Sequence, residues 1–371
     1  MGFIRLYLAL SVLAWHSKSL LPWKMHSGPE AVELFFSISG FYMAMVLSQG
    51  YSSTKSFYLS RFLRIYFPYI IALLFVVVIS FVSKFVFNDW LQLAPYTSHP
   101  LKNNSIFGFA FAALSNLTIF LQDIVVFASF AQTPTSVHGD GLLSNYLLLP
   151  QCWSVSLELT FYLIAPYINR SKTAFLLFTL GMSVVGRLAF YQITGFAQDP
   201  WNSRFFPFEL AFFLAGMLGW RLYDKYKIST RLPSCQGMWS YILCCILMLG
   251  AFYLHLQVGT WLSDHLGAAF YVLYYLSFAV AVACAFAVFR KNAIDRFIGE
   301  LSFPIYLTHI IIIKLTTTVL QSYHLPESLL GPIAGLATMV TSLAFFVFAI
   351  KPFEVWRHKI VSRGEKKSLA L

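Results

Sequence analysis

The sequence predicts an all-α, polytopic membrane protein, and three observations lead to this prediction. Of the 371 residues, 58% are hydrophobic and only 11% are charged, a composition too apolar for a soluble domain. Apolar runs long enough to cross a hydrocarbon core of about 30 Å recur along the chain. The basic residues behind the net charge of +11 lie between these runs, so we interpret them as topology signals and expect no nucleic-acid partner.

About ten segments have the length and composition of transmembrane helices, since one crossing needs about 20 apolar residues. They are residues 3–22, 31–49, 66–87, 153–169, 173–194, 204–220, 238–258, 267–289, 298–320 and 328–350. They form one predicted membrane-embedded domain, residues 1–350, which is followed by a basic cytoplasmic tail, residues 351–371. A cleaved signal peptide is an alternative for the first segment, but Trp15, His16 and Lys18 stand where a cleavage site requires small residues.

The stretch 106–130 is apolar but interrupted by polar residues. These are Ser115, Asn116, Thr118, Gln122 and Asp123. If this stretch crossed the membrane once, the basic loops of the second half of the chain would lie outside, against the positive-inside rule. We therefore predict a re-entrant segment or a pair of half-helices here, sheltered beside a cavity, with both termini in the cytoplasm.

The first predicted span contains two ionisable side chains, Arg5 and His16. A helical rise of 1.5 Å per residue separates them by about 16 Å along the axis. Arg5 lies at the cytoplasmic boundary, where an arginine often serves as an interface anchor. His16 lies beyond the midplane, where an ionisable residue usually has a function, although a structural histidine bonded to a neighbouring helix is the alternative.

A second histidine, His309, lies about midway along the predicted span 298–320, at a depth similar to that of His16. Two histidines at one depth favour a shared polar cavity over two independent packing roles. The remaining outer histidines do not have the spacing of metal ligands, so the sequence predicts no metal site. They are His26, His99, His138 and His324.

The motif QCWSVSLELTFYLIAP, residues 151–166, enters the membrane from the outside and carries Glu158 on the same helical face as Ser154. A carboxylate at this depth is costly, so it needs a partner or a task. Arg187 and Arg204 are the candidate partners. A structural Glu–Arg pair and a direct catalytic role both remain open.

Arg61 and Arg64 are three residues apart at the cytoplasmic entry of the third span, which places both guanidinium groups on one helical face. Planar guanidinium donors suit phosphate groups, but positive-inside anchoring also explains such a pair. In the second span, Ser37, Ser39 and Gly40 indicate close helix packing, and the lining of a substrate tunnel is the alternative.

Six patterns in this order resemble the acyltransferase-3 family of integral membrane acyltransferases. They are the R-x10-H of Arg5 and His16, LFFSISGF, the R-x-x-R of Arg61 and Arg64, WSVSLELTFYLIAP, RFFPFELAFFLAGML and GELSFPIYLTH. The resemblance extends over nearly the whole chain. It implies transfer of an acyl group, most often acetyl from cytoplasmic acetyl-CoA, to a hydroxyl of a cell-surface or lipid-linked glycan in the bacterial inner membrane.

The resemblance also implies roles for single residues. His16 matches the essential histidine, Arg5 matches its basic companion, and Arg61 and Arg64 match the donor-binding pair. The arginines are then expected to hold the phosphates of acyl-CoA at the cytoplasmic mouth. The expected partners are acyl-CoA, the glycan acceptor and the lipid bilayer.

We predict His16, Glu158 and His309 as the catalytic residues. Acyl transfer from a thioester needs a base for the hydroxyl proton, and histidine suits this task because its ordinary pKa is near working pH. His16 as general base and His16 as acyl carrier both remain open, while Glu158 and His309 orient His16 or serve the acceptor. A proton-coupled exporter of a sugar or lipid-linked intermediate is the alternative function, and a membrane scaffold or sensor is a third.

Overall fold

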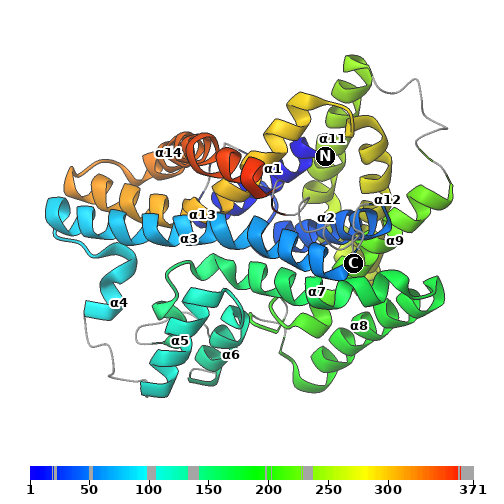
Figure 1. The fold of residues 1–371 in the computed structure, drawn as a ribbon, viewed down its shortest axis with the longest axis horizontal. Helices are drawn as coiled ribbons and strands as arrows, with labels where there is room; N and C mark the ends of the chain where they lie inside the picture. The colour runs from blue at the N-terminus through cyan, green and yellow to red at the C-terminus, as the bar shows by residue number, and fades with distance from the viewer. Residues whose placement is uncertain are drawn as a thin grey trace.

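The computed structural model shows a helical protein (Figure 1). It describes all residues except 19, 21–22, 50–52, 98–105, 133–141, 197–198, 202, 227, 229–236, 358–359 and 361–371. This described part of the chain contains helices, turns and loops but no β-strand. The predicted all-α fold class is therefore confirmed.

The α-helices are connected by short 3-10 turns and loops. In the first half they are α1 (Gly2–His16), α2 (Gly28–Gln49), α3 (Thr54–Phe87), α4 (Ala94–Thr97), α5 (Ile106–Thr118), α6 (Gln122–Gln132) and α7 (Trp153–Arg170). In the second half they are α8 (Thr173–Thr194), α9 (Phe206–Lys225), α11 (Met238–Leu266), α12 (Ala268–Phe289), α13 (Ala293–Ser322) and α14 (Leu330–Phe345). The 3-10 turns are η1 (Leu91–Leu93), η2 (Leu143–Tyr146), η3 (Pro150–Cys152) and η5 (Glu327–Leu329), and a π-helical turn, η6 (Phe346–Ile350), follows α14.

Seven helices among the described residues are long and apolar enough to cross a membrane. They are α2, α3, α8, α11, α12, α13 and the segment Glu327–Arg357, which contains α14. The other three predicted spans correspond to α1, α7 and α9. α1 ends at His16 instead of residue 22, so its 15 residues measure only about 22 Å. The helices fit a multi-pass membrane protein, and the count of ten spans stays a prediction.

Residues 106–130 form two short helices, α5 and α6, as the paired half-helix prediction requires. In the turn between them, Ile119 and Leu121 have φ angles of 69°, a left-handed conformation that is costly for such side chains. Asn116, one of the interrupting polar residues, stabilises this turn region: its amide donates to the carbonyl of Tyr146 (2.7 Å) and accepts from the N–H of Leu148 (2.8 Å). Re-entry of this pair into the membrane stays a prediction.

The predicted basic tail begins within a helix. Residues 351–357 continue η6, and Arg357 donates to Glu354 and to Ser60 of α3, both at 2.5 Å. The rest of the predicted tail, except residue 360, lies outside the described residues.

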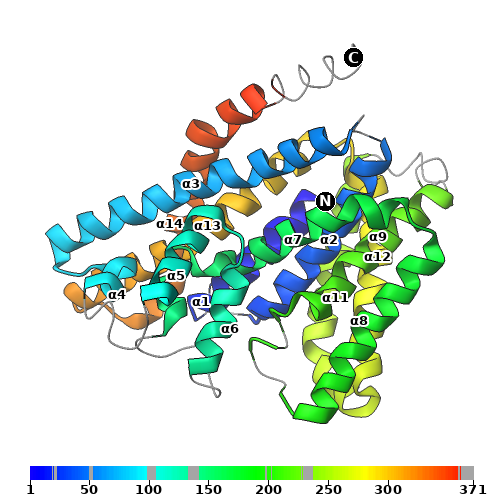
Figure 2. The ribbon, with the colours of Figure 1, turned by 60° about the horizontal axis from the view of Figure 1, so that its bottom comes forward.

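Two groups of helices meet at α7 (Figures 1 and 2). α13 packs along α1 and also contacts α3 and α14, while α9 packs along α2 and also contacts α8 and α12. α7 contacts α2, α3 and α9, so it lies between the groups. α1 and α2 also pack against each other, so the helices that carry the site residues, α1, α2, α3, α7 and α13, form one connected set.

α2 and α9 approach each other at two glycines. A β-carbon on Gly40 would lie 1.9 Å from the carbonyl oxygen of Phe213, and one on Gly216 would lie 1.8 Å from that of Ser37. The Ser37 hydroxyl donates to the carbonyl of Phe212 at 3.1 Å. The close packing predicted for Ser37 and Gly40 is therefore confirmed, because only glycine allows the two backbones this near.

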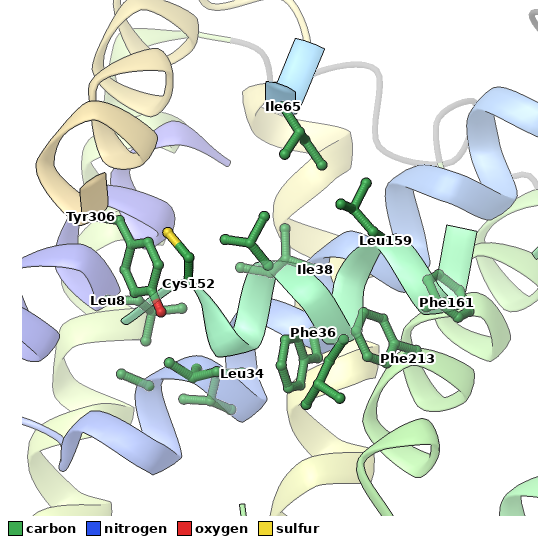
Figure 3. Packing of buried hydrophobic residues seen from close by; sticks show 14 of the residues in the cluster. Leu8, Leu34, Phe36, Ile38, Ile65, Cys152, Leu159, Phe161, Phe213 and Tyr306 are labelled. Atoms are coloured by element: carbon green, nitrogen blue, oxygen red, sulfur yellow. The ribbon is translucent and has the colours of Figure 1, made fainter. Parts of the chain in front are cut away.

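An aromatic stack lies beside this contact. Phe213 of α9 stacks on Phe36 of α2 and on Phe161 of α7, with ring centroids 4.4 Å and 4.3 Å apart (Figure 3). Each of these side chains is buried. The stack joins three helices, and offset aromatic pairs of this kind add about 0.5–1.5 kcal/mol beyond their buried area.

The start of α1 is held against α13. The carboxylate of Asp295 accepts from the backbone N–H of Gly2 (2.7 Å) and of Phe3 (2.9 Å), which otherwise lack helical partners. A β-carbon on Gly2 would lie 1.6 Å from the carbonyl oxygen of Asp295, so this contact also depends on glycine. As a result, Arg5 and His16 have a fixed position relative to α13.

Candidate active site

His16 and His309 form a pair between α1 and α13. Their ring centroids are 5.3 Å apart, with an angle of 38° between the planes. The structure therefore brings together the two histidines that the sequence placed at one depth. His16 is the last residue of α1 and is exposed, whereas His309 is only 1% exposed. Only His16 is accessible to a substrate in this arrangement.

The ring of His309 has a defined tautomer. Its Nδ1 lies 2.8 Å from the carbonyl oxygen of Tyr306, and a carbonyl can only accept, so Nδ1 carries the hydrogen. In the neutral ring, Nε2 then keeps a lone pair. This buried Nε2 has no hydrogen-bond partner among the described residues. Such an unsatisfied polar atom next to a second histidine is typical of a functional site.

A set of hydrogen bonds from Gln151 in η3 and Ser154 in α7 holds α13 beside His309, and we call this set the clamp. The amide of Gln151 donates to the carbonyls of Leu307 (2.8 Å) and Tyr306 (3.3 Å). The hydroxyl of Tyr306 donates to the carbonyl of Gln151 (2.5 Å) and lies 2.7 Å from the Ser154 hydroxyl. Figure 3 shows Tyr306 beside Cys152 at this junction. We did not predict Gln151 or Tyr306 as site residues, although Tyr306 lies within GELSFPIYLTH and Gln151 lies two residues before WSVSLELTFYLIAP.

We expect Gln151→Ala to lower thermal stability, because it leaves two buried carbonyls with fewer donors, at a cost of about 1–3 kcal/mol. It should also lower the catalytic rate by loosening the Tyr306 carbonyl that orients His309. Thermal unfolding in detergent and an acyl-transfer assay test this. Gln257→Ala, at an exposed glutamine of α11, is the control. Equal stability of the two variants would contradict the clamp.

Glu158 is held by two hydroxyl groups. Ser39 of α2 and Tyr162 of α7 both donate to its Oε1 atom, each at 2.5 Å. Neither candidate partner, Arg187 or Arg204, makes these contacts, because helical depth does not specify which neighbouring helix faces a side chain. The tunnel alternative for Ser39 gains support, since its hydroxyl points to a site residue.

The two arginines expected beside Glu158 bind other carboxylates. Arg187 of α8 donates to Glu33 of α2 (3.1 Å) and to Glu209 of α9 (3.4 Å). Arg204 donates to Asp199 at 2.7 Å. Arg187 therefore joins α8 to α2 and α9 through two ion pairs.

The three arginines predicted to bind the donor, Arg5, Arg61 and Arg64, lie on α1 and α3. Arg61 is 9% exposed and Arg64 is exposed, and the charges of Arg5 and Arg61 act on Arg64. Tyr162 donates a hydrogen bond to Glu158 and also lies within electrostatic range of Arg61. The three arginines predicted to bind the donor are thus gathered at one place by α1 and α3.

Tyr306, next to His309, lies within electrostatic range of Glu158. A groove of about 440 Å³ opens beside Arg61 and Tyr162. Its other lining residues are Lys55, Tyr58, Leu59, Phe62, Phe120, Leu159 and Leu163. The groove has the size of a small-molecule site, with two basic side chains and mostly apolar walls.

The model of the acyltransferase domain of the acyltransferase-3 family matches residues 2–350. No curated protein and no solved structure matches the chain. Of the three classes that the sequence left open, an acyltransferase, an exporter and a scaffold or sensor, the family match favours the acyltransferase. The chain therefore belongs to the acyltransferase-3 family of membrane acyltransferases.

Proposed function

We propose that this protein is an O-acyltransferase of the bacterial inner membrane, with both termini in the cytoplasm. It transfers an acyl group, acetyl in the first instance, from cytoplasmic acyl-CoA to a hydroxyl of a cell-surface or lipid-linked glycan. The main support is the exposed His16 beside the buried His309, together with the three arginines, of which Arg5 and Arg61 lie within electrostatic range of Arg64. Family membership supports the transfer of an acyl group.

The donor end of the proposed site is basic. Arg5, Arg61 and Arg64 supply guanidinium donors for the phosphates of CoA, which prefer planar, charged partners. α1 is helical throughout from Arg5 to His16, so the base lies about 16 Å along the axis from the first arginine. The extended arm of CoA covers a distance of this order, which places the thioester near His16.

The chemical step in this proposal involves the acyl-CoA donor, the acceptor hydroxyl and His16 as the base. His16 takes the proton of the acceptor hydroxyl, and the oxygen attacks the thioester carbonyl. The C–S bond then breaks, and the CoA thiolate leaves with the proton that His16 had taken. His309 is a positioning residue in this scheme, because its buried ring cannot reach the acceptor.

We expect Arg61→Ala to raise the KM for acyl-CoA by about 10- to 100-fold with a small effect on kcat, because one charge-assisted contact of about 1.5–3 kcal/mol is lost. Binding of labelled acetyl-CoA to the purified protein and a steady-state transfer assay measure this. Arg290→Ala, at an exposed arginine after α12, serves as the control and should bind the donor normally. Unchanged donor binding in Arg61→Ala would refute the donor site.

A further inference from the structure

A second group of ionisable residues lies away from the proposed active site. His26, Glu30 and His255 come from the loop before α2, the first turn of α2 and the middle of α11. One ligand atom from each lies within 4.8 Å of the others. The acyl-transfer scheme above does not use these residues.

The three side chains already contact one another closely. His255 Nε2 lies 2.6 Å from Glu30 Oε1, and His26 Nε2 lies 3.9 Å from the same oxygen. The rings of His26 and His255 are nearly parallel, with centroids 5.5 Å apart. Two imidazoles and one carboxylate are the ligand set that catalytic and regulatory zinc sites use, with a fourth position open.

The surroundings of His26 suit a metal ligand. Its Nδ1 lies 3.0 Å from the Tyr7 hydroxyl, which can accept a hydrogen from Nδ1, and in that tautomer the Nε2 lone pair is available to an ion. Tyr274 places its hydroxyl 3.0 Å from Nε2, next to the point where an ion would lie.

Charge and access are also compatible with a cation. Glu30 contributes a carboxylate oxygen as a ligand. The side chain of His26 is fully buried, but those of Glu30 and His255 are 20% and 12% exposed, which gives an entry path. Ligand atoms of a tetrahedral zinc lie about 3.3 Å apart, so shifts on the order of 1 Å in these side chains would close the site.

We propose that His26, Glu30 and His255 bind a zinc-class divalent metal ion that joins the start of α2 to α11. Of the three protein ligands, the first two are close in sequence and the third lies more than 200 residues away, which is why ligand spacing did not reveal the site. The metal stabilises this junction of helices. This proposal does not depend on the identity of the donor or the acceptor.

The test uses the full chain, purified in detergent and treated with a chelator. Zn²⁺ is titrated against a competing chromophoric chelator, metal content is measured by mass spectrometry, and thermal unfolding is followed with and without Zn²⁺. We expect one zinc per chain and a higher melting temperature with zinc. His255→Ala and Glu30→Gln should lose both effects, and Tyr7→Phe should weaken zinc binding by about 10- to 100-fold.

His265→Ala is the matched control, because His265 is an exposed histidine of the same helix whose Nδ1 contacts only the carbonyl of Trp261 among the described residues. It should bind zinc like the unmodified chain. Glu30→Gln keeps the size of the side chain, so it remains informative if His255→Ala does not fold. The proposal is overturned if the unmodified chain binds no stoichiometric zinc, or if Glu30→Gln and His255→Ala bind it as tightly.

Discussion

A His16→Ala variant is expected to lose acyl transfer by about 10²- to 10⁴-fold in kcat, the usual contribution of a positioned general base. His16 is exposed and His309 is buried, so His309 cannot replace His16 in its contact with the acceptor. Binding of labelled acetyl-CoA should stay near normal, because the donor phosphates are assigned to the arginines. The measurement is a transfer assay at saturating donor, together with a donor-binding assay.

His309→Gln separates positioning from direct base catalysis. If His309 acts only through His16, this variant should retain more activity than His16→Ala, and the double variant should be no worse than His16→Ala alone. His324→Ala, at an exposed histidine after α13, is the control for general effects of removing an imidazole. A His16→Ala protein that inserts normally and keeps full transfer would show that the assignment is wrong.

Gly216→Ala is expected to prevent normal folding. The added β-carbon would overlap the carbonyl oxygen of Ser37, and backbone cannot move aside as a flexible side chain can. Overpacking usually costs about 1–3 kcal/mol, and a clash between two helix backbones should exceed that range. Gly40→Ala meets the carbonyl of Phe213 and should have a similar effect. Size-exclusion profiles and thermal unfolding of the detergent-solubilised protein measure the loss.

The chain offers matched controls for these substitutions. Gly181 of α8 and Gly250 of α11 also lie within helices, but a β-carbon on either would meet nothing within 4 Å. Gly181→Ala and Gly250→Ala should therefore be neutral or slightly stabilising, since alanine is the better helix former by about 1 kcal/mol. A Gly216→Ala protein as monodisperse and as stable as Gly181→Ala would mean that α2 and α9 are not this close.

Depth along a helix was predictable from the sequence, and this explains which site features were found. Counting residues from the basic boundaries placed His16 and His309 at one level, and the structure brings their rings together. The polar residues in 106–130 predicted an interrupted helix, and the chain does turn at Ile119. In both cases the signal is local, a spacing or a composition within one segment.

The identity of a neighbouring helix was not predictable in the same way. Arg187 and Arg204 were the candidate partners of Glu158, but Ser39 and Tyr162 donate to its carboxylate, because α7 turns this side chain toward α2. The clamp of Gln151 on the α13 backbone and the approach of His255 to Glu30 join residues more than 150 positions apart. Such contacts depend on how each helix is rotated about its own axis. A helix that is apolar on all faces carries little sequence signal for this rotation.

The attachment of α1 to α13 at Asp295 has a consequence for how the protein can evolve. One uninterrupted helix carries both Arg5 and His16, and its first turn is fixed to the helix that carries His309. Inserting or deleting a single residue between them would rotate His16 by about 100° and turn it away from His309. Variation in chain length among related proteins should therefore be confined to the loops, while this stretch keeps a constant number of residues.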